Sequence, residues 1–424
     1  MNKIYNKQFD ETYYKEILDN GLEVLIFHKP NFISSFVGIG TNFGALNLHQ
    51  KYLDKDFYFN PGVAHFLEHK LFESEEKNIF DLFSNLGCDI NAFTSYNETV
   101  YYFQTTNQDI KEPLNLLLDF VQDLDINEES VEKEKGIIIQ EVMMHKQEVE
   151  SRLLEETYKS LYHTYPLIYD IGGSIESINS ITKGELELAY SLNYHPCNMV
   201  LLVVGPNNPN EIIKTIKGNQ SKKTFERKII KSITVFEKEP LEVNRKEYSF
   251  KMNIQKAKHV YALKLKADFK DKKDCAYKER CMNILMRLYF SPFNPHYQKW
   301  LDEGIINDYF AYDVDFDMNY ANILFLCESD DINLKELIDN ELNEDLIDEE
   351  SLNQIKRQYI GASFRPFNDI GIFGSFYIRD YLNGFDYFDI LEVMKDIDVD
   401  ALRQIKEDLN TDNFALIHVY PQDK

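Results

Sequence analysis

The pattern of apolar and polar residues divides the chain into two halves of similar design. Each half begins with two segments that alternate as β-strands do, continues into helical periodicity, and ends on a strand that starts with Asn and stops at Pro. The predicted strands are residues 22–27, 35–44 and 198–206 in the first half, and 248–252, 259–266 and 413–421 in the second. This repetition predicts a duplicated unit and therefore two domains of about equal size.

We expect the first domain to span residues 1–210 and the second to span residues 241–424. Between them we expect a linker or hinge over residues 211–240, because residues 206–240 are rich in Lys and Asn and nearly free of aromatic residues. The chain has 424 residues, of which 44% are hydrophobic and 14% aromatic, so it is long enough to bury a core in each domain.

Charge and hydropathy limit the classes of function. The net charge of −25 argues against nucleic-acid binding, because the phosphate backbone selects clusters of Lys and Arg. Residues 1–16 contain no apolar stretch typical of a signal peptide, and no segment approaches about 18 uninterrupted apolar residues, so we expect a cytoplasmic protein that does not span a membrane. The five cysteines show no C-x-x-C pairing, so we expect reduced thiols and assign them no role.

One short segment carries candidate chemistry. Asn60 and Pro61 suit the start of a helix. His65 and His69, four residues apart, would face the same side of that helix and could bind one metal ion, with Glu68 pointing at the open side of the ion. The alternative is a chance spacing on a solvated helix. Two of only ten histidines on one helical stripe favour the metal site.

Two histidines leave a zinc ion short of its usual three protein ligands, so another residue must come from elsewhere. A long helical pattern over residues 128–154 offers Glu141, His145 and Glu148. Glu141 lies among apolar residues that predict burial for the middle of this helix, and a buried carboxylate needs a partner. His145 and Glu148, nearer the polar end, remain alternatives.

Together these segments resemble the inverzincin metallopeptidases, the family of pitrilysin, insulin-degrading enzyme and mitochondrial processing peptidase, and especially its short bacterial members. The order from His65 to His69 is H-x-x-E-H, and residues 134–141 resemble the family's second motif. The resemblance implies that His65, His69 and Glu141 bind Zn²⁺, and that Glu134 supports the site. It also implies an α+β fold of two similar domains, each a mostly antiparallel sheet covered on one face by helices, which close as a clamshell.

A further segment resembles the family's edge strand beside the zinc, against which the substrate backbone lies. This resemblance implies that the substrate contacts Asn91, Ala92, Phe93 and Thr94. Zinc held by two imidazoles and one carboxylate keeps a fourth position for water and lowers the pKa of that water to about 7. Glu68 would then act as general base and general acid, and Glu134 would accept the second ring proton of a ligand histidine.

Active members of the family place an Arg and a Tyr seven residues apart in a domain across the chamber from the zinc. No Arg after residue 240 has a Tyr seven positions later. We therefore expect a zinc-dependent endopeptidase that hydrolyses peptides or unfolded polypeptides, including leader peptides, as the catalytic subunit of a heterodimer. A homologous subunit without zinc would supply the Arg and Tyr, and a homodimer is less favoured. The alternative is a non-catalytic zinc-binding or structural subunit of a peptidase-like complex.

Overall fold

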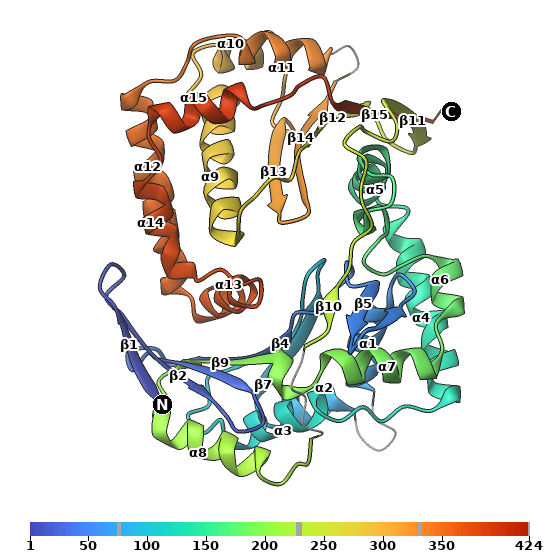
Figure 1. Ribbon diagram of the computed structural model, residues 1–424, viewed down its shortest axis with the longest axis vertical. Coiled ribbons are helices and arrows are strands. Elements are labelled where there is room, and N and C mark those ends of the chain that lie inside the picture. Colours follow the sequence, from blue (N-terminus) through green and yellow to red (C-terminus); the bar gives the residue numbers. More distant parts are fainter. Residues whose placement is uncertain (74–77, 226–230, 330–332, 423–424) are drawn as a thin grey trace. The chain divides into compact units, whose positions relative to one another are not determined.

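The structure is a computed structural model that describes residues 1–73, 78–225, 231–329 and 333–422. It contains two compact units, each assembled from separate stretches of the chain (Figure 1). Unit 1 comprises residues 1–143, 169–235 and 364–388, and unit 2 comprises residues 144–168, 236–363 and 389–424. In the part of the chain that is described, no helix is both long and apolar enough to cross a membrane.

Unit 1 is built on a seven-stranded sheet. Its order is β1 (Asn2–Asn6), β2 (Glu11–Ile17), β3 (Glu23–His28), β9 (Met199–Gly205), β4 (Ser35–Thr41), β8 (Thr99–Thr105) and β7 (Cys88–Thr94). Neighbouring strands are antiparallel except β3 and β9, which run parallel. A small second sheet has the order β10 (Ile233–Thr234), β5 (His49–Tyr52) and β6 (Lys55–Tyr58). Strand β7 therefore forms one edge of the main sheet.

Helices cover the sheet of unit 1 on one face and enclose its main core. The helices of this unit that precede residue 225 are α1 (Val63–Phe72), α2 (Ile79–Asn85), α3 (Lys111–Val121), α4 (Glu128–His145, whose last two residues belong to unit 2), α6 (Ile175–Ser180), α7 (Lys183–Asn193) and α8 (Pro209–Gln220). The core joins alternate residues of β4 and β9, such as Val37, Ile39, Leu201 and Val203, to the apolar sides of these helices. This alternation is what a sheet with one buried helical face requires.

A helix from the second half of the chain, α13 (Ile370–Leu382), packs on β4 and β9 from the other face of this sheet. Glycines allow the close approach. A Cβ at Gly374 would lie 2.3 Å from Cδ1 of Phe36, and a Cβ at Gly40 would lie 2.7 Å from Cδ1 of Leu382. Aromatic rings of β2, β3 and α13 fill the rest of the contact, among them Tyr13, Phe27, Phe373 and Tyr377. The sequence did not predict this second covering helix.

Unit 2 is built on a five-stranded sheet that, like the main sheet of unit 1, is mostly antiparallel. Its order is β11 (Glu247–Met252), β15 (Phe414–Pro421), β12 (Lys258–Leu265), β14 (Tyr320–Glu328) and β13 (Ala311–Asp317). Only β11 and β15 run parallel. Its helices are α5 (Val149–Leu161), α9 (Lys272–Tyr289), α10 (Tyr297–Asp302), α11 (Leu334–Leu342), α12 (Glu349–Ser363), α14 (Ile390–Lys395) and α15 (Val399–Glu407).

Each unit contains one helix that comes from the other half of the sequence. Helix α5 comes from the first half of the chain but packs on β12 and β15 of unit 2. Helix α13 comes from the second half but belongs to unit 1. The domain boundaries at residues 210 and 240 and the clamshell closure stay predictions. The first ten residues of the expected linker, 211–220, lie in the regular helix α8.

The predicted strands are present, whereas two helix predictions were wrong in detail. Helix α1 begins at Val63 and its N-cap is Gly62, with φ of 94°; the side chain of Asn60 instead donates to Glu185. The single helix expected over residues 128–154 is two helices, because α4 ends at His145 and the backbone of residue 148 is extended. Burial of the middle of α4 is also partial: Ile138 is buried, while Ile137 and Met143 are exposed.

Candidate metal centre

Helix α1 carries three of the predicted site residues, and its own buried side fixes it in place. Phe66 and Leu67 are fully buried in the core of unit 1, so the adjacent His65 and His69 are held at the surface of that core. The start of α1 lies against the loop that precedes α6. A Cβ at Gly173, whose φ is 82°, would lie 2.5 Å from the carbonyl oxygen of Pro61, so only glycine fits this contact.

Helix α4 places Glu141 opposite the two histidines. Its Oε1 lies 3.8 Å from Nε2 of His65, and its Oε2 lies 3.4 Å from Nε2 of His69. Potential ligand atoms of these three residues all lie within 4.8 Å of one another. A tetrahedral zinc ion with bonds of about 2.1 Å holds its ligand atoms about 3.4 Å apart. The donor set and the spacing therefore fit a zinc ion after a small closure.

Glu134 lies on the same helix two turns earlier and supports His69 from behind. Its Oε1 accepts a hydrogen bond from Nδ1 of His69 at 2.9 Å, and the residue is buried. With the proton fixed on Nδ1, the lone pair of Nε2 is directed at Glu141 and at the space where an ion would lie. Burial opposes protonation of His69, but hydrogen bonds to Glu134 and Glu141 outweigh it and raise the pKa of His69 to about 9. In the absence of a metal, a proton on His69 therefore supplies the positive charge of the site.

Glu68 is held in place from the neighbouring edge strand. Its Oε2 accepts a hydrogen bond from Oγ1 of Thr94 at 2.6 Å. Oγ1 of Thr94 lies 3.4 Å from Oγ1 of Thr99, which donates to the backbone carbonyl of Phe43 at 2.8 Å. Burial raises the pKa of Glu68, and the hydrogen bond from Thr94 and the charge of His69 offset this only in part. Such a carboxyl group is suited to both accepting and returning a proton.

Strand β7 carries the four residues predicted to bind substrate, and it pairs with β8 on one side only. Asn91 is exposed, and its Oδ1 accepts a hydrogen bond from the backbone N–H of Ala92 at 2.8 Å. Ala92 packs against the core on the side that faces α1, where Thr94 meets Glu68. An edge strand of this kind can accept an added strand, provided that the incoming chain displaces the Asn91 amide.

Phe93 points to the other face of the sheet, where it contacts α13. The guanidinium of Arg379 lies 5.9 Å from the Phe93 ring centroid, and its Nε lies 3.3 Å from Oε1 of the buried Glu98. Asn383 Nδ2 donates to Oε2 of Glu98 at 2.9 Å. Sequence reasoning missed these contacts, because no local pattern links residue 379 to a strand almost three hundred positions earlier.

The alternatives for the third ligand are not brought into this group. Among the described residues, the cluster of three that could hold a metal ion consists of His65, His69 and Glu141, without His145 or Glu148. His145 is the last residue of α4, and Glu148 is the N-cap of α5. The break between α4 and α5 separates Glu148 from the face that carries Glu134 and Glu141, whereas His145 stays on α4, one turn beyond Glu141.

Comparisons with known proteins agree with this geometry. Residues 55–173 match the family model described as Insulinase (Peptidase family M16), and residues 180–359 match the one described as Peptidase M16 inactive domain. A Bacillus subtilis (strain 168) protein named Uncharacterized zinc protease YmfH is 34% identical over 98% of this chain and 98% of its own. The mitochondrial-processing peptidase subunit beta of Rattus norvegicus is 31% identical over 47% of this chain and 40% of its own. The crystal structure of a putative M16-like peptidase from Alicyclobacillus acidocaldarius gives a TM-score of 0.90 at 28% identity, covering 97% of this chain and 98% of that one.

Proposed function

Because this chain belongs to the insulinase family of peptidases, family M16, we propose that it is a zinc-dependent endopeptidase that hydrolyses peptides or unfolded polypeptides. The observation that carries the proposal is the group in unit 1: His65, His69 and Glu141 face one space, with Glu68 beside it and Glu134 behind His69. A purely structural subunit has no physical need for a partly buried carboxyl group next to a metal position.

Each residue of the group has a separable role in the proposed reaction. His65, His69 and Glu141 would hold a zinc ion, which when bound supplies a Lewis acid and lowers the pKa of water to about 7. Glu68 would accept the proton of the attacking water and return it to the leaving amine. Thr94 would aim the Glu68 carboxylate through the 2.6 Å hydrogen bond, and Glu134 would keep the proton of His69 on Nδ1.

The substrate would bind in extended form along β7. Main-chain hydrogen bonds to this edge strand would fix the peptide largely independently of its sequence, with Asn91 giving way at the N–H of Ala92. A chain must be unfolded to add as a strand, which supports peptides, leader peptides and unfolded polypeptides as the substrate class.

The reduced cysteines support a cytoplasmic location, since none of the five is paired.

We further propose that the chain acts as the zinc-bearing member of a heterodimer. The support is the asymmetry of the sequence, in which no Arg after residue 240 has a Tyr seven positions later. A relative named as a subunit, mitochondrial-processing peptidase subunit beta, adds support. A specific observation favours a second candidate, a non-catalytic subunit: the second family model is described as an inactive domain. That description covers residues 180–359 and leaves out the whole metal centre.

Metal analysis combined with a single substitution tests the proposed activity. The purified protein should contain about one zinc per chain, held by one group of three ligands. Glu68→Gln should keep the zinc and abolish cleavage of an unfolded test protein, because the amide cannot accept the proton of water. Glu148→Gln serves as the matched control and should leave both zinc and cleavage unchanged. Full cleavage by the Glu68→Gln protein, or a protein that binds no zinc, would refute the proposal.

A further inference from the structure

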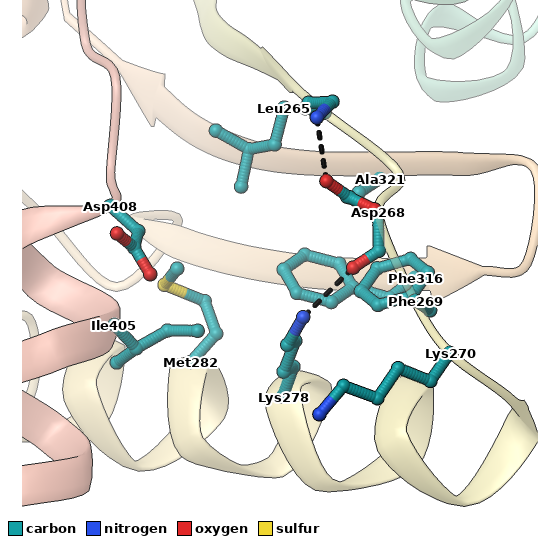
Figure 2. Close-up of a pocket in the computed structure, with 11 residues that line it drawn as sticks. Leu265, Asp268, Phe269, Lys270, Lys278, Met282, Phe316, Ala321, Ile405 and Asp408 are labelled. Carbon is teal, nitrogen blue, oxygen red and sulfur yellow. Dashed lines mark hydrogen bonds and ion pairs between the residues drawn. The ribbon is translucent and has the colours of Figure 1, made fainter.

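Unit 2 contains a cavity that the proposed reaction does not use. It lies between the end of β12, the loop that follows this strand, the turn between β13 and β14, and the helices α9 and α15 (Figure 2). Its volume is about 500 Å³, and all of its lining residues belong to unit 2. A volume of several hundred Å³ is typical of sites for small ligands.

The inner wall of this cavity is apolar. Figure 2 shows the aliphatic and sulfur-containing side chains on one side and two phenyl rings on the other. The residues concerned are Leu265, Phe269, Met282, Phe316 and Ile405. Met282 is buried, and the centroids of the two phenyl rings lie 5.7 Å apart. The wall can therefore receive a large apolar group and remove it from water.

The rim of the cavity is charged, and one of its cations is left for a ligand. Lys266 pairs with Asp268 at 2.6 Å. Lys278 donates to the backbone carbonyl of Asp268 at 2.8 Å and lies 3.4 Å from the carboxylate of Asp274. Lys270 is also exposed and forms no ion pair within 4 Å among the described residues, although its charge helps to lower the pKa of the Asp274 carboxyl group. In a protein of net charge −25, a lysine that forms no close ion pair and lies beside an apolar wall indicates an anionic ligand.

A carboxylate of the protein narrows the choice of ligand. Asp408, just beyond the end of α15, lies on the opposite side of the cavity from Lys270 (Figure 2). The carboxylate of a fatty acid could pair with Lys270, but a fatty acid has no hydrogen-bond donor for Asp408. The carboxyl-terminal end of a peptide offers an α-carboxylate to the lysine, a backbone N–H of a preceding residue to the aspartate and its last side chain to the apolar wall.

We propose that this cavity binds the carboxyl-terminal residue of a peptide that ends in a large apolar side chain. Lys270 pairs with the α-carboxylate, and the side chain enters the space lined by Met282 and Ile405. The inference rests on the proposed peptidase function for the source of such peptides, which are substrates or cleavage products. Binding itself requires no hydrolysis and is measured separately from it.

Photolabelling of the intact, zinc-containing chain tests the site. The probe is N-acetyl-leucyl-p-benzoylphenylalanine, whose benzophenone inserts into nearby C–H bonds, and labelled residues are identified by mass spectrometry. Labelling is expected at Met282 or Ile405. It should fall about threefold when the probe carries a C-terminal amide, and by a similar factor in Lys270→Gln, since a threefold change corresponds to about 0.65 kcal/mol, within the range for an exposed ion pair. The matched control is Lys273→Gln, an exposed lysine of α9 outside the cavity lining, which should label as the wild type does.

Competition and a filled cavity complete the test. N-acetyl-leucyl-phenylalanine should displace the probe at concentrations at which decanoate does not, and Ile405→Phe should block labelling while the unfolding midpoint stays close to that of the wild type. Equal labelling by the acid and the amide forms of the probe, or labelling only outside the cavity, would overturn the proposal. Equal competition by decanoate would also overturn it and would identify the ligand as a fatty acid. Labelling as expected, together with no peptidase activity even in the complex with a partner subunit, would refute the proposed function and leave this site standing.

Discussion

Glu68 depends on a hydrogen-bond chain that runs from Thr94 to Thr99 and ends on the backbone of Phe43. Because the chain is anchored on the edge strand, it fixes the direction of the carboxylate relative to the substrate. We predict that Thr94→Val lowers kcat about tenfold, the factor expected for losing one hydrogen bond to a charged group. Steady-state kinetics and zinc analysis check this.

The conservative variant separates this role from a general loss of packing. Thr94→Ser keeps the hydroxyl and should restore most of kcat, whereas KM and zinc content should change little in either variant. A drop in zinc, or an equal loss of kcat in the serine variant, would mean that the residue contributes packing alone.

His69 links zinc binding to pH. Its pKa in the metal-free site is about 9, so below that pH zinc must displace a proton from Nε2. We predict that the apparent zinc affinity rises about tenfold per pH unit from pH 7 and levels off near pH 9, because one proton is released per ion. Competition with a chelator of known affinity measures this. Glu134→Gln removes one of the carboxylates that raise the pKa of His69, so the zinc affinity of this variant should level off at a lower pH. A zinc affinity independent of pH in both proteins would contradict the assignment.

At the scale of elements, α13 depends on a close approach to β4. The ring of Phe36 is fully buried and stacks on Tyr102 with centroids 5.4 Å apart, so it cannot move away from a Cβ at Gly374, which would lie 2.3 Å from it. We predict that Gly374→Ala lowers the free energy of unfolding by about 1–3 kcal/mol through overpacking. Denaturant titration gives this quantity.

The control is a helical glycine of the same unit with free space around it. A Cβ at Gly218 in α8 would meet nothing within 4 Å. Gly218→Ala should therefore be neutral or stabilise by up to about 1 kcal/mol, since alanine has the higher helix propensity. If both variants behaved alike, the contact between α13 and β4 would not be as tight as the distances indicate.

At the scale of the whole molecule, the zinc half of the proposed active site is complete within unit 1, while the expected Arg and Tyr pair has no counterpart in the sequence. Loss of one oxyanion donor typically costs about a hundredfold in rate. We predict that the isolated chain binds zinc but cleaves peptides at least about a hundredfold more slowly than its complex with a homologous partner. Purification from the native cell followed by reconstitution checks this. Full activity of the homogeneous chain would exclude the heterodimer.

Much of the site could be predicted because its information is local. The spacing of His65, Glu68 and His69 follows from 3.6 residues per helical turn, and residues 134 and 141, seven apart, also share one helical face. The strands at 198–206 and 413–421 were likewise predicted from their apolar runs. The helix break at residues 146–148 was not, because no proline or glycine marks it and the periodicity continues through it.

The sequence by itself determined which residues could bind a metal, since ligand chemistry and helical spacing are properties of short segments. Only the tertiary structure decided that Glu141, and not His145 or Glu148, faces the two histidines. It also decided that Thr94 holds Glu68, and that α13 covers the sheet of unit 1. These contacts join residues far apart in the chain, and they are selected by burial and close packing over the whole core, which no local pattern encodes.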